Sequence, residues 1–303
     1  MFDVLKYKKY FLGFSATLVL AAWVCIAVFG LRPGIDLQGG TEWQFTIAKS
    51  GVTPTEIQND IANAGSIKDV QAVVENDGSF MVKLPAISEA EHQAYLKVLQ
   101  TDFGKVNEES FSSIGPAIGA ELAVRSEWAI FFVLVGISIY IAYAFRKVSE
   151  PKAWKYGFVT LATLAHDVSI PAGVLAVLGV LAGVQIDSNF IVALLVVMGF
   201  SVHDTIVVFD RIRENVLVHR GKRTSFYDIV NASIRETFAR SVNTSFTLFL
   251  VLVALMIFGP SSLFYFVLTI LVGTVFGTYS SIFVASPLLY LWQQRGERKA
   301  TGK

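Results

Sequence analysis

An acidic side chain inside an apolar run of membrane length is the first candidate for chemistry. The run begins at Phe190 and contains Asp204. An ionisable group in hydrocarbon costs about 2.5–3.5 kcal/mol on insertion scales, so it is first considered functional. On a helix, Ser201 and Thr205 share a face with Asp204, and their hydroxyls can hold its carboxyl in either protonation state. The alternative is a structural carboxylate that pairs with a cation, because the run ends soon after, at Phe209.

A second acidic residue, Asp167, stands deeper in its own apolar run, 157–181. A charge at that depth needs a partner or water, or the group becomes neutral. His166 and His203 each directly precede one of the two aspartates. Adjacent side chains diverge by about 100° on a helix, so we expect each histidine to face away from its aspartate. Histidine suits proton relay because it titrates near physiological pH, and a plain hydrogen bond to a neighbouring helix is the alternative.

Two further features are associated with the last two apolar runs. Arg240 stands just before the fifth run, which begins with polar residues. The arginine side chain is long enough to reach a carboxylate on a neighbouring helix. An arginine that extends its head to the membrane interface is the alternative. In the last run Gly273, Gly277 and Ser281 repeat every four residues, which predicts close helix packing and no chemistry of its own.

Enzyme signatures are missing from the sequence. It contains no His-Glu-x-x-His, no Gly-x-Ser-x-Gly, no Gly-x-Gly-Asp and no Walker A loop. No cluster has the spacing of metal ligands with cysteine, and the single cysteine, Cys25, excludes an intrachain disulfide. We therefore expect a protein that is not an enzyme and that uses no cofactor and no metal.

The composition predicts a membrane protein that must position these residues on helices. Hydrophobic residues make up 53% of the 303 and charged residues only 16%, against about 25% in soluble domains. A span needs about 17–25 apolar residues. Six runs qualify: 10–30, 128–145, 157–181, 189–209, 242–258 and 263–291. The first is too long for a signal peptide and lacks a cleavage site, so it predicts an uncleaved helix.

The distribution of Lys and Arg predicts the orientation. Both residues gather before the first run, between the second and third, between the fourth and fifth, and after the sixth. The short loops 182–188 and 259–262 have none. By the positive-inside rule both termini are cytoplasmic and 31–127 lies outside. The chain divides into 1–30 with the first helix, the outside domain 31–127, and 128–303 with the remaining helices.

The outside domain has the periodicity of an α+β fold. Strand patterns and two capped helices alternate, with a hairpin signal at 76–79. The strands are expected at 42–48, 70–75, 80–84 and 106–114, and the helices at 54–64 and 88–101. The order β-α-β-β-α-β predicts a ferredoxin-like domain between the first and second membrane helices.

Segment 211–241 carries apolar residues at helical spacing among basic ones. The pattern predicts an amphipathic helix on the cytoplasmic surface of the lipid bilayer. Its positive charge also suits nucleic acid, but anionic lipid and the charge rule explain it, so we expect no nucleic-acid partner.

Four segments, in order along the chain, resemble the SecD/SecF family of bacterial protein translocase subunits. Segment 199–215, Gly-Phe-Ser-Val-His-Asp-Thr-Ile-Val-Val-Phe-Asp-Arg-Ile-Arg-Glu-Asn, resembles the family's fourth membrane helix. Segment 34–41, Gly-Ile-Asp-Leu-Gln-Gly-Gly-Thr, resembles the start of its extracytoplasmic domain. Segments 240–245, Arg-Ser-Val-Asn-Thr-Ser, and 277–287, Gly-Thr-Tyr-Ser-Ser-Ile-Phe-Val-Ala-Ser-Pro, resemble its fifth and last helices. The likeness covers essentially the whole chain.

The resemblance implies a scaffold of the resistance-nodulation-division type in the bacterial cytoplasmic (inner) membrane. It implies pairing with SecD beside the SecYEG channel, where the proton-motive force helps preproteins clear the channel. The family's functional carboxylate falls on Asp204, its essential arginine on Arg240, and its third-helix His-Asp on His166 and Asp167. His203 stands where the family usually has Asn. In this scheme Asp204 alternates between a charged state paired with Arg240 and a neutral state.

Two other functions remain open at this stage. One is a self-contained, proton-driven exporter of small molecules or lipids on the same scaffold. Such exporters usually have two six-helix halves, whereas this chain has one. The other is a purely structural scaffold for the translocon.

Overall fold

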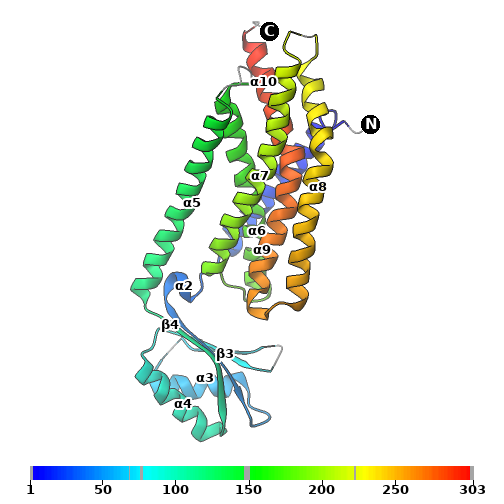
Figure 1. Cartoon of the computed structure of the whole chain (residues 1–303). Coiled ribbons are helices and arrows are strands. Elements are labelled where there is room, and N and C mark those ends of the chain that lie inside the picture. The colour runs from blue at the N-terminus through cyan, green and yellow to red at the C-terminus, as the bar shows by residue number, and fades with distance from the viewer. Residues whose placement is uncertain (1–2, 68, 76–77, 147–150, 222, 301–303) are drawn as a thin grey trace. The chain divides into compact units, whose positions relative to one another are not determined.

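The computed structural model describes residues 3–67, 69–75, 78–146, 151–221 and 223–300 (Figure 1). The chain forms two compact units. Unit 1, the membrane unit, comprises Met1–Arg32, Trp128–Gln185 and Asn189–Lys303, and unit 2, the α+β unit, comprises Pro33–Glu127 with Ile186–Ser188.

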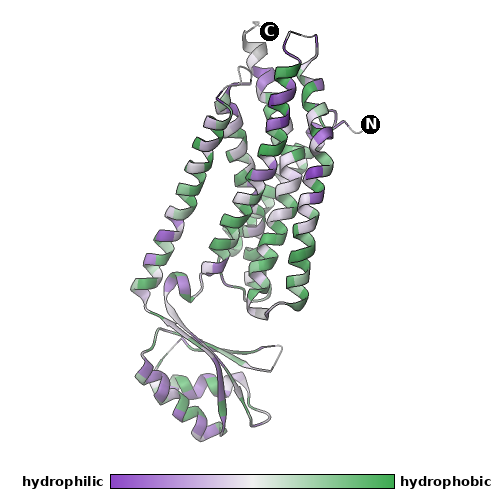
Figure 2. Ribbon diagram, in the orientation of Figure 1, coloured by the Kyte–Doolittle hydropathy of each residue, from purple (hydrophilic) through white to green (hydrophobic). Residues whose placement is uncertain are grey.

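The membrane unit contains six helices that are long and apolar enough to span a bilayer, which confirms the six predicted runs. Figure 2 shows these helices as mostly hydrophobic ribbon, interrupted by single hydrophilic residues. The chain is therefore a multi-pass membrane protein. The spanning elements are α1 (Lys8–Phe29), α5 (Pro116–Ala144), α6 (Ala153–Leu181), α7 (Ser188–Val218), α8 (Phe226–Phe258) and α9 (Phe264–Ser280). After the short turn η1 (Ser261–Leu263), α9 leads directly into the π-helical segment η2 (Ser281–Ala285) and then α10 (Ser286–Ala300).

Three spans are central and three are peripheral. The buried share of the most apolar window is 56% in α6, 50% in α7 and 56% in the last span. It is only 11% in α1, 6% in α5 and 17% in α8. The central spans therefore bury whatever polar side chains they carry, whereas the peripheral spans leave apolar surface for lipid or a partner.

The small-residue stripe of the last span packs inside this chain. A Cβ at Gly273 would overlap the side chain of Val197 on α7, and a Cβ at Gly277 would lie 3.1 Å from the Cβ of Ser201. The stripe thus brings α9 against α7, as small residues do between membrane helices. The third member, Ser281, has chemistry that the sequence did not predict, as described below.

The described residues of 211–241 do not form a separate helix. Most of them belong to the end of α7, which continues to Val218, and to the beginning of α8, which starts at Phe226. The apolar positions Ile229, Val230 and Ile234 are buried against the rest of the unit. The prediction of helix for these positions is confirmed, but the buried apolar side chains pack against protein within this unit.

The α+β unit follows the predicted element order. After the short helix α2 (Ile35–Gln38) come β1 (Gly40–Ile47), α3 (Pro54–Gly65), β2 (Gln71–Val74), β3 (Phe80–Leu84), α4 (Glu89–Phe103) and β4 (Val106–Ile114). The sheet order is β2-β3-β1-β4, and every neighbouring pair is antiparallel. Residues 76–77 of the predicted hairpin turn lie outside the described part of the chain. Helices α3 and α4 cover one face of the sheet (Figure 1).

Side-chain caps and one apolar core explain these elements. Thr53 and Ser88 each accept a bond from the backbone N–H three residues on, at Glu56 and Glu91, and each glutamate bonds back to the cap residue. This reciprocal capping satisfies amides that a helix start leaves free. The core is formed by Trp43, Phe45, Ile57, Ile61, Val82, Tyr95 and Leu99, among others.

The Gly39-Gly40 pair permits a close approach at the base of α5. Both residues have positive φ, 84° and 139°, in the region where side chains are strained. A Cβ at Gly39 would lie 2.6 Å from the Cα of Pro116, and one at Gly119 would meet the Gly39 backbone. The pair therefore fixes the start of the sheet against the first turn of α5.

Candidate functional site

The centre of the membrane unit holds a polar cluster in an otherwise apolar bundle. It receives side chains from α6, α7, α8, α9 and η2, all of them buried. Its members are His166, Asp167, Ser201, Asp204, Thr205, Ser241, Ser280 and Ser281. A buried polar group is stable when it is hydrogen-bonded, so the partners of each carboxylate decide what the cluster can do.

Asp167 is the fully bonded member, with a side chain that is 0% exposed. His166 Nδ1 lies 2.8 Å from its Oδ1. The Ser280 hydroxyl donates to Oδ2 at 2.8 Å, and the Ser201 hydroxyl donates to the same oxygen. Three polar groups on α6, α7 and α9 thus converge on one carboxylate, which can remain in place without water.

The His166–Asp167 contact corrects one expectation from the sequence. Adjacent helical positions do diverge, so we expected the two side chains to face apart. Their rotatable bonds bring the ring nitrogen and the carboxylate together at 2.8 Å. The opposite ring nitrogen, Nε2 of His166, is buried and has no hydrogen-bond partner among the described residues.

Asp204 is buried too, at 5% exposed, but its bonding is incomplete. Its Oδ2 has no hydrogen-bond partner in the part of the chain that is described. The hydroxyls of Ser241 and Ser281 lie near this carboxyl, and Ser241 Oγ likewise has no hydrogen-bond partner among the described residues. Asp204 stands near the middle of α7, because this helix continues past the end of the apolar run at Phe209 to Val218.

Ser201 and Thr205 do not hold Asp204 as predicted. Ser201 bonds to Asp167, and Thr205 Oγ1 lies 2.9 Å from the hydroxyl of Ser281. They share a helix face with Asp204, but neighbouring helices offer these hydroxyls other partners. Only the tertiary arrangement decides between such partners.

His203 and Arg240 are exposed on this chain. Arg240 lies near the middle of α8, and among the ion pairs of the described residues none joins it to Asp204. The structure therefore brings together Asp167, His166 and Ser201, and places Asp204 beside them. It leaves Arg240 and His203 on the surface.

The sequence assigned no chemistry to three serines of the cluster, although Ser281 was predicted as a packing residue. Ser280 donates to Asp167, and Ser241 and Ser281 lie near Asp204. The polar pair Ser280-Ser281 in an otherwise apolar helix was a usable signal. These residues sit at the start of η2, and π-helical turns inside α-helices are frequent at functional sites. Among the described residues, no group of three or more His, Cys, Asp or Glu side chains could hold a metal.

Together, the fold and the cluster define a multi-pass membrane protein whose bundle encloses two carboxylates. The family described as "Protein export membrane protein SecD/SecF, C-terminal" matches residues 94–295, and the "SecD/SecF GG Motif" matches 26–46. The latter includes the Gly39-Gly40 pair. The chain belongs to the SecD/SecF family.

Individual relatives agree with this assignment. The chain is 42% identical to protein translocase subunit SecF of Thermobaculum terrenum, over 97% of this chain and 95% of that protein. It is 35% identical to protein translocase subunit SecDF of Thermus thermophilus, over 95% of this chain but 38% of that longer protein. The crystal structure of SecDF from the latter organism matches with a TM-score of 0.82 and 31% identity, over 97% of this chain and 39% of that chain.

Proposed function

We propose that this chain is a non-enzymatic subunit of the Sec translocase that, with SecD, couples the proton-motive force to protein export. Family membership and the names of its SecF relatives support a role in export. The Lys and Arg distribution supports a place in the bacterial inner membrane with both termini cytoplasmic and 31–127 outside. The strand order β2-β3-β1-β4 supports a ferredoxin-like fold for that outside domain.

The unequal bonding of the two buried carboxyls carries the proposal. Asp167 has three polar partners, so it holds α6, α7 and α9 together. Asp204 has an oxygen with no hydrogen-bond partner among the described residues, and the groups near its carboxyl are the hydroxyls of Ser241 and Ser281 and the side chains of His203 and Asp167. A carboxyl in that position is stable when a proton occupies it, and it needs a counter-charge when the proton leaves. Asp204 is therefore the proton carrier, and Asp167 is the fixed anchor beside it.

Arg240 supplies the counter-charge in the second state. In the present arrangement it is exposed and forms no ion pair with Asp204, which agrees with a protonated Asp204. Loss of the proton would attract Arg240 and move α8 relative to α7. One charge that crosses 100 mV releases about 2.3 kcal/mol, which is comparable to the free-energy gap of a two-state rearrangement.

SecD is the partner that covers the exposed polar side chains. His203 lies within the apolar run 189–209 and Arg240 lies two residues before the run 242–258, and both are exposed on this chain. Polar side chains at such positions rarely face lipid, because an uncompensated charge in hydrocarbon is expensive. The longer SecDF relative joins both names in one protein, which supports a complex of this chain with SecD and, through it, with the SecYEG channel and the translocating preprotein.

The test is proton-driven export by membrane vesicles that contain the full complex. Asp204→Asn keeps the size of the side chain but cannot lose a proton, so it is expected to abolish the stimulation of export while the complex still assembles. Arg240→Ala is also expected to abolish the stimulation of export. Asp204→Glu is expected to retain part of the stimulation. His203→Asn is expected to be mild. The matched control is Asp210→Asn, an exposed carboxylate on the same helix that pairs with Arg213 at 2.9 Å. Normal proton-driven stimulation of export in Asp204→Asn vesicles would contradict the proton-carrier role and leave only a structural scaffold function.

Cross-linking tests the partner separately. A photo-reactive residue at position 203 is expected to cross-link to SecD in native membranes. The comparison is a photo-reactive residue at Phe246, an exposed position of α8. Labelling of lipid alone at position 203 would contradict the pairing. Reporter fusions at Glu75 and Arg295 are expected to lie on opposite sides of the membrane, and reporters on the same side would contradict the orientation.

A further inference from the structure

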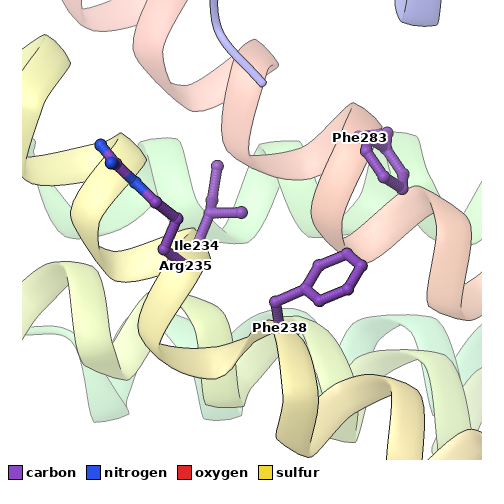
Figure 3. Close-up of a pocket in the computed structure, with 4 residues that line it drawn as sticks. All are labelled: Ile234, Arg235, Phe238 and Phe283. Atoms are coloured by element: carbon purple, nitrogen blue, oxygen red, sulfur yellow. The ribbon is translucent and has the colours of Figure 1, made fainter. Parts of the chain in front are cut away.

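A pocket of about 250 Å³ lies on the membrane unit between α8 and η2. It is lined by Ile234, Arg235 and Phe238 of α8 and by Phe283 of η2 (Figure 3). Three of the four lining side chains are hydrocarbon. Figure 3 shows the guanidinium of Arg235 extending away from the two phenyl rings. We call this site the α8–η2 groove.

The groove lies beside the first turn of α1 and the residues that precede it. The ring of Phe11 is 4.5 Å from that of Phe283, centroid to centroid. The backbone N–H of Leu5 donates to Asn231 Oδ1 at 3.3 Å, one turn before Arg235. This segment adds exposed positive charge at the same end of the bundle, from Lys6 and Lys9.

Arg235 retains free hydrogen-bond donors. Its Nε donates to the backbone oxygen of Asn231 at 3.1 Å, and no ion pair among the described residues includes it. The Asp3 carboxylate lies near Arg235 but is not bonded to it among the described residues. Instead, this carboxylate accepts bonds from the Tyr227 hydroxyl at 2.8 and 2.9 Å. A guanidinium has five N–H donors in a planar fork, so several remain for an anion.

We propose that the α8–η2 groove binds one acyl chain of an anionic phospholipid, whose phosphate is held by Arg235. The volume is below the range of about 300–1,000 Å³ that is typical of sites for compact small molecules, and it suits a slender chain. The apolar walls match hydrocarbon, and the free guanidinium with the nearby lysines matches a phosphate. Basic pockets between membrane helices select anionic head groups for the same reason.

The first test uses the full-length chain in detergent and native mass spectrometry with dioleoyl phosphatidylglycerol or dioleoyl phosphatidylcholine. One phosphatidylglycerol is expected to be retained about fivefold more tightly than phosphatidylcholine, the usual effect of one basic residue near a head group. Arg235→Gln is expected to remove this preference, whereas Arg220→Gln, in an exposed loop position, keeps it. No preference in the wild-type chain, or a preference that survives Arg235→Gln, would overturn the proposal.

The second test locates the acyl chain. In Phe238→Trp the new indole lies in the groove, and in Phe246→Trp it lies at an exposed position of the same helix. Brominated phosphatidylglycerol is expected to quench the indole at 238 more strongly than brominated phosphatidylcholine, and both lipids are expected to quench the indole at 246 equally. Equal quenching at 238, or an indole at 238 that a protein partner shields from both lipids, would overturn the proposal.

Discussion

Both units of the molecule contain a buried histidine bonded to a carboxylate, but the two pairs are built differently. In the membrane unit His166 and Asp167 meet at 2.8 Å, and the carboxylate is the centre of the cluster. In the α+β unit His92 Nε2 meets Glu108 Oε1 at 2.6 Å, and there the imidazole is the centre. The His92 ring stacks on Phe111, with centroids 3.7 Å apart, between helix α4 and strand β4.

The difference lies in the access of water to the carboxylate. The Asp167 side chain is 0% exposed, whereas the side chain of Glu108 is 32% exposed. A bond that is lost at Glu108 can be replaced by a bond to water, but a bond that is lost at Asp167 cannot. A histidine–carboxylate bond is therefore replaceable by water at Glu108 in the α+β unit and irreplaceable at Asp167 in the membrane unit.

The largest expected effect follows from removal of the central carboxylate of the membrane unit. In Asp167→Ala, the side chains of His166, Ser201 and Ser280 lose their common acceptor. The side chains of His166 and Ser201 are then left unsatisfied, whereas Ser280 still donates to the backbone oxygen of Gly277 at 3.0 Å. Each unsatisfied buried group costs about 1–3 kcal/mol, so the free energy of unfolding is expected to fall by about 3 kcal/mol or more. Thermal unfolding of the purified chain in detergent measures this, with Asp167→Asn as a milder control that keeps one acceptor oxygen. Equal stability of Asp167→Ala and the wild type would contradict the claim that the bonds of Asp167 cannot be replaced by water.

A smaller effect is expected from removal of the central histidine of the α+β unit. His92→Ala loses the stack on Phe111 and the bond to Glu108, and water replaces part of what Glu108 loses. We expect a local destabilisation of about 2 kcal/mol. Hydrogen exchange of the β1 and β4 amides in the full chain measures it. His219→Ala, in the membrane unit, is the matched control and should leave these amides unchanged. A loss as large as that of Asp167→Ala would contradict the role assigned to water.

Single hydroxyls sharpen the comparison further. Ser280→Ala removes one donor from the enclosed Asp167, and we expect a cost of about 1–2 kcal/mol. The Ser113 hydroxyl donates to the backbone oxygen of Ile87 at 2.8 Å and accepts from the Thr41 hydroxyl at 2.8 Å and the Ile87 N–H at 3.2 Å. Because Ser113 is exposed, water can replace these bonds in Ser113→Ala, and the cost is expected to be about 0.5 kcal/mol. Parallel unfolding experiments on the two variants measure the difference. A Ser113→Ala variant that is less stable than Ser280→Ala would reverse the order.

The smallest effect is expected from acid and is confined to the helix starts of the α+β unit. The backbone N–H groups of Thr53 and Ser88, and then their hydroxyls, lower the pKa of Glu56 and Glu91 below the ordinary value of 4.5. A carboxyl with a lowered folded-state pKa stabilises the fold above its unfolded-state pKa, and this contribution is lost as pH falls through the folded value. Amide exchange at the first turns of α3 and α4 should therefore increase, relative to intrinsic rates, as pH drops below 4.5. Glu56→Gln should weaken this response at α3 and preserve it at α4.

The sequence predicted the elements of this protein well, because their signals are local. Apolar length is a property of each span separately, and all six were confirmed. Capping residues and alternation likewise lie within a few positions of the element they define, so Thr53 and Ser88 marked their helices correctly. The bounds near 211–241 were wrong because burial against neighbouring helices, which a single segment does not reveal, extends α7 and α8.

The sequence by itself also determined which residue types stand inside the membrane helices, since Asp167 and Asp204 interrupt apolar runs whatever the packing. Only the tertiary structure decided which hydroxyl bonds to which carboxylate. Ser201 lies on the face of Asp204 by helical spacing, yet it donates to Asp167 because α6 and α9 place that carboxylate and Ser280 within reach. Helical periodicity fixes the direction of a side chain from its own axis, but the partner depends on the distances between axes. Those distances are set by the close packing of Gly273 and Gly277 against α7.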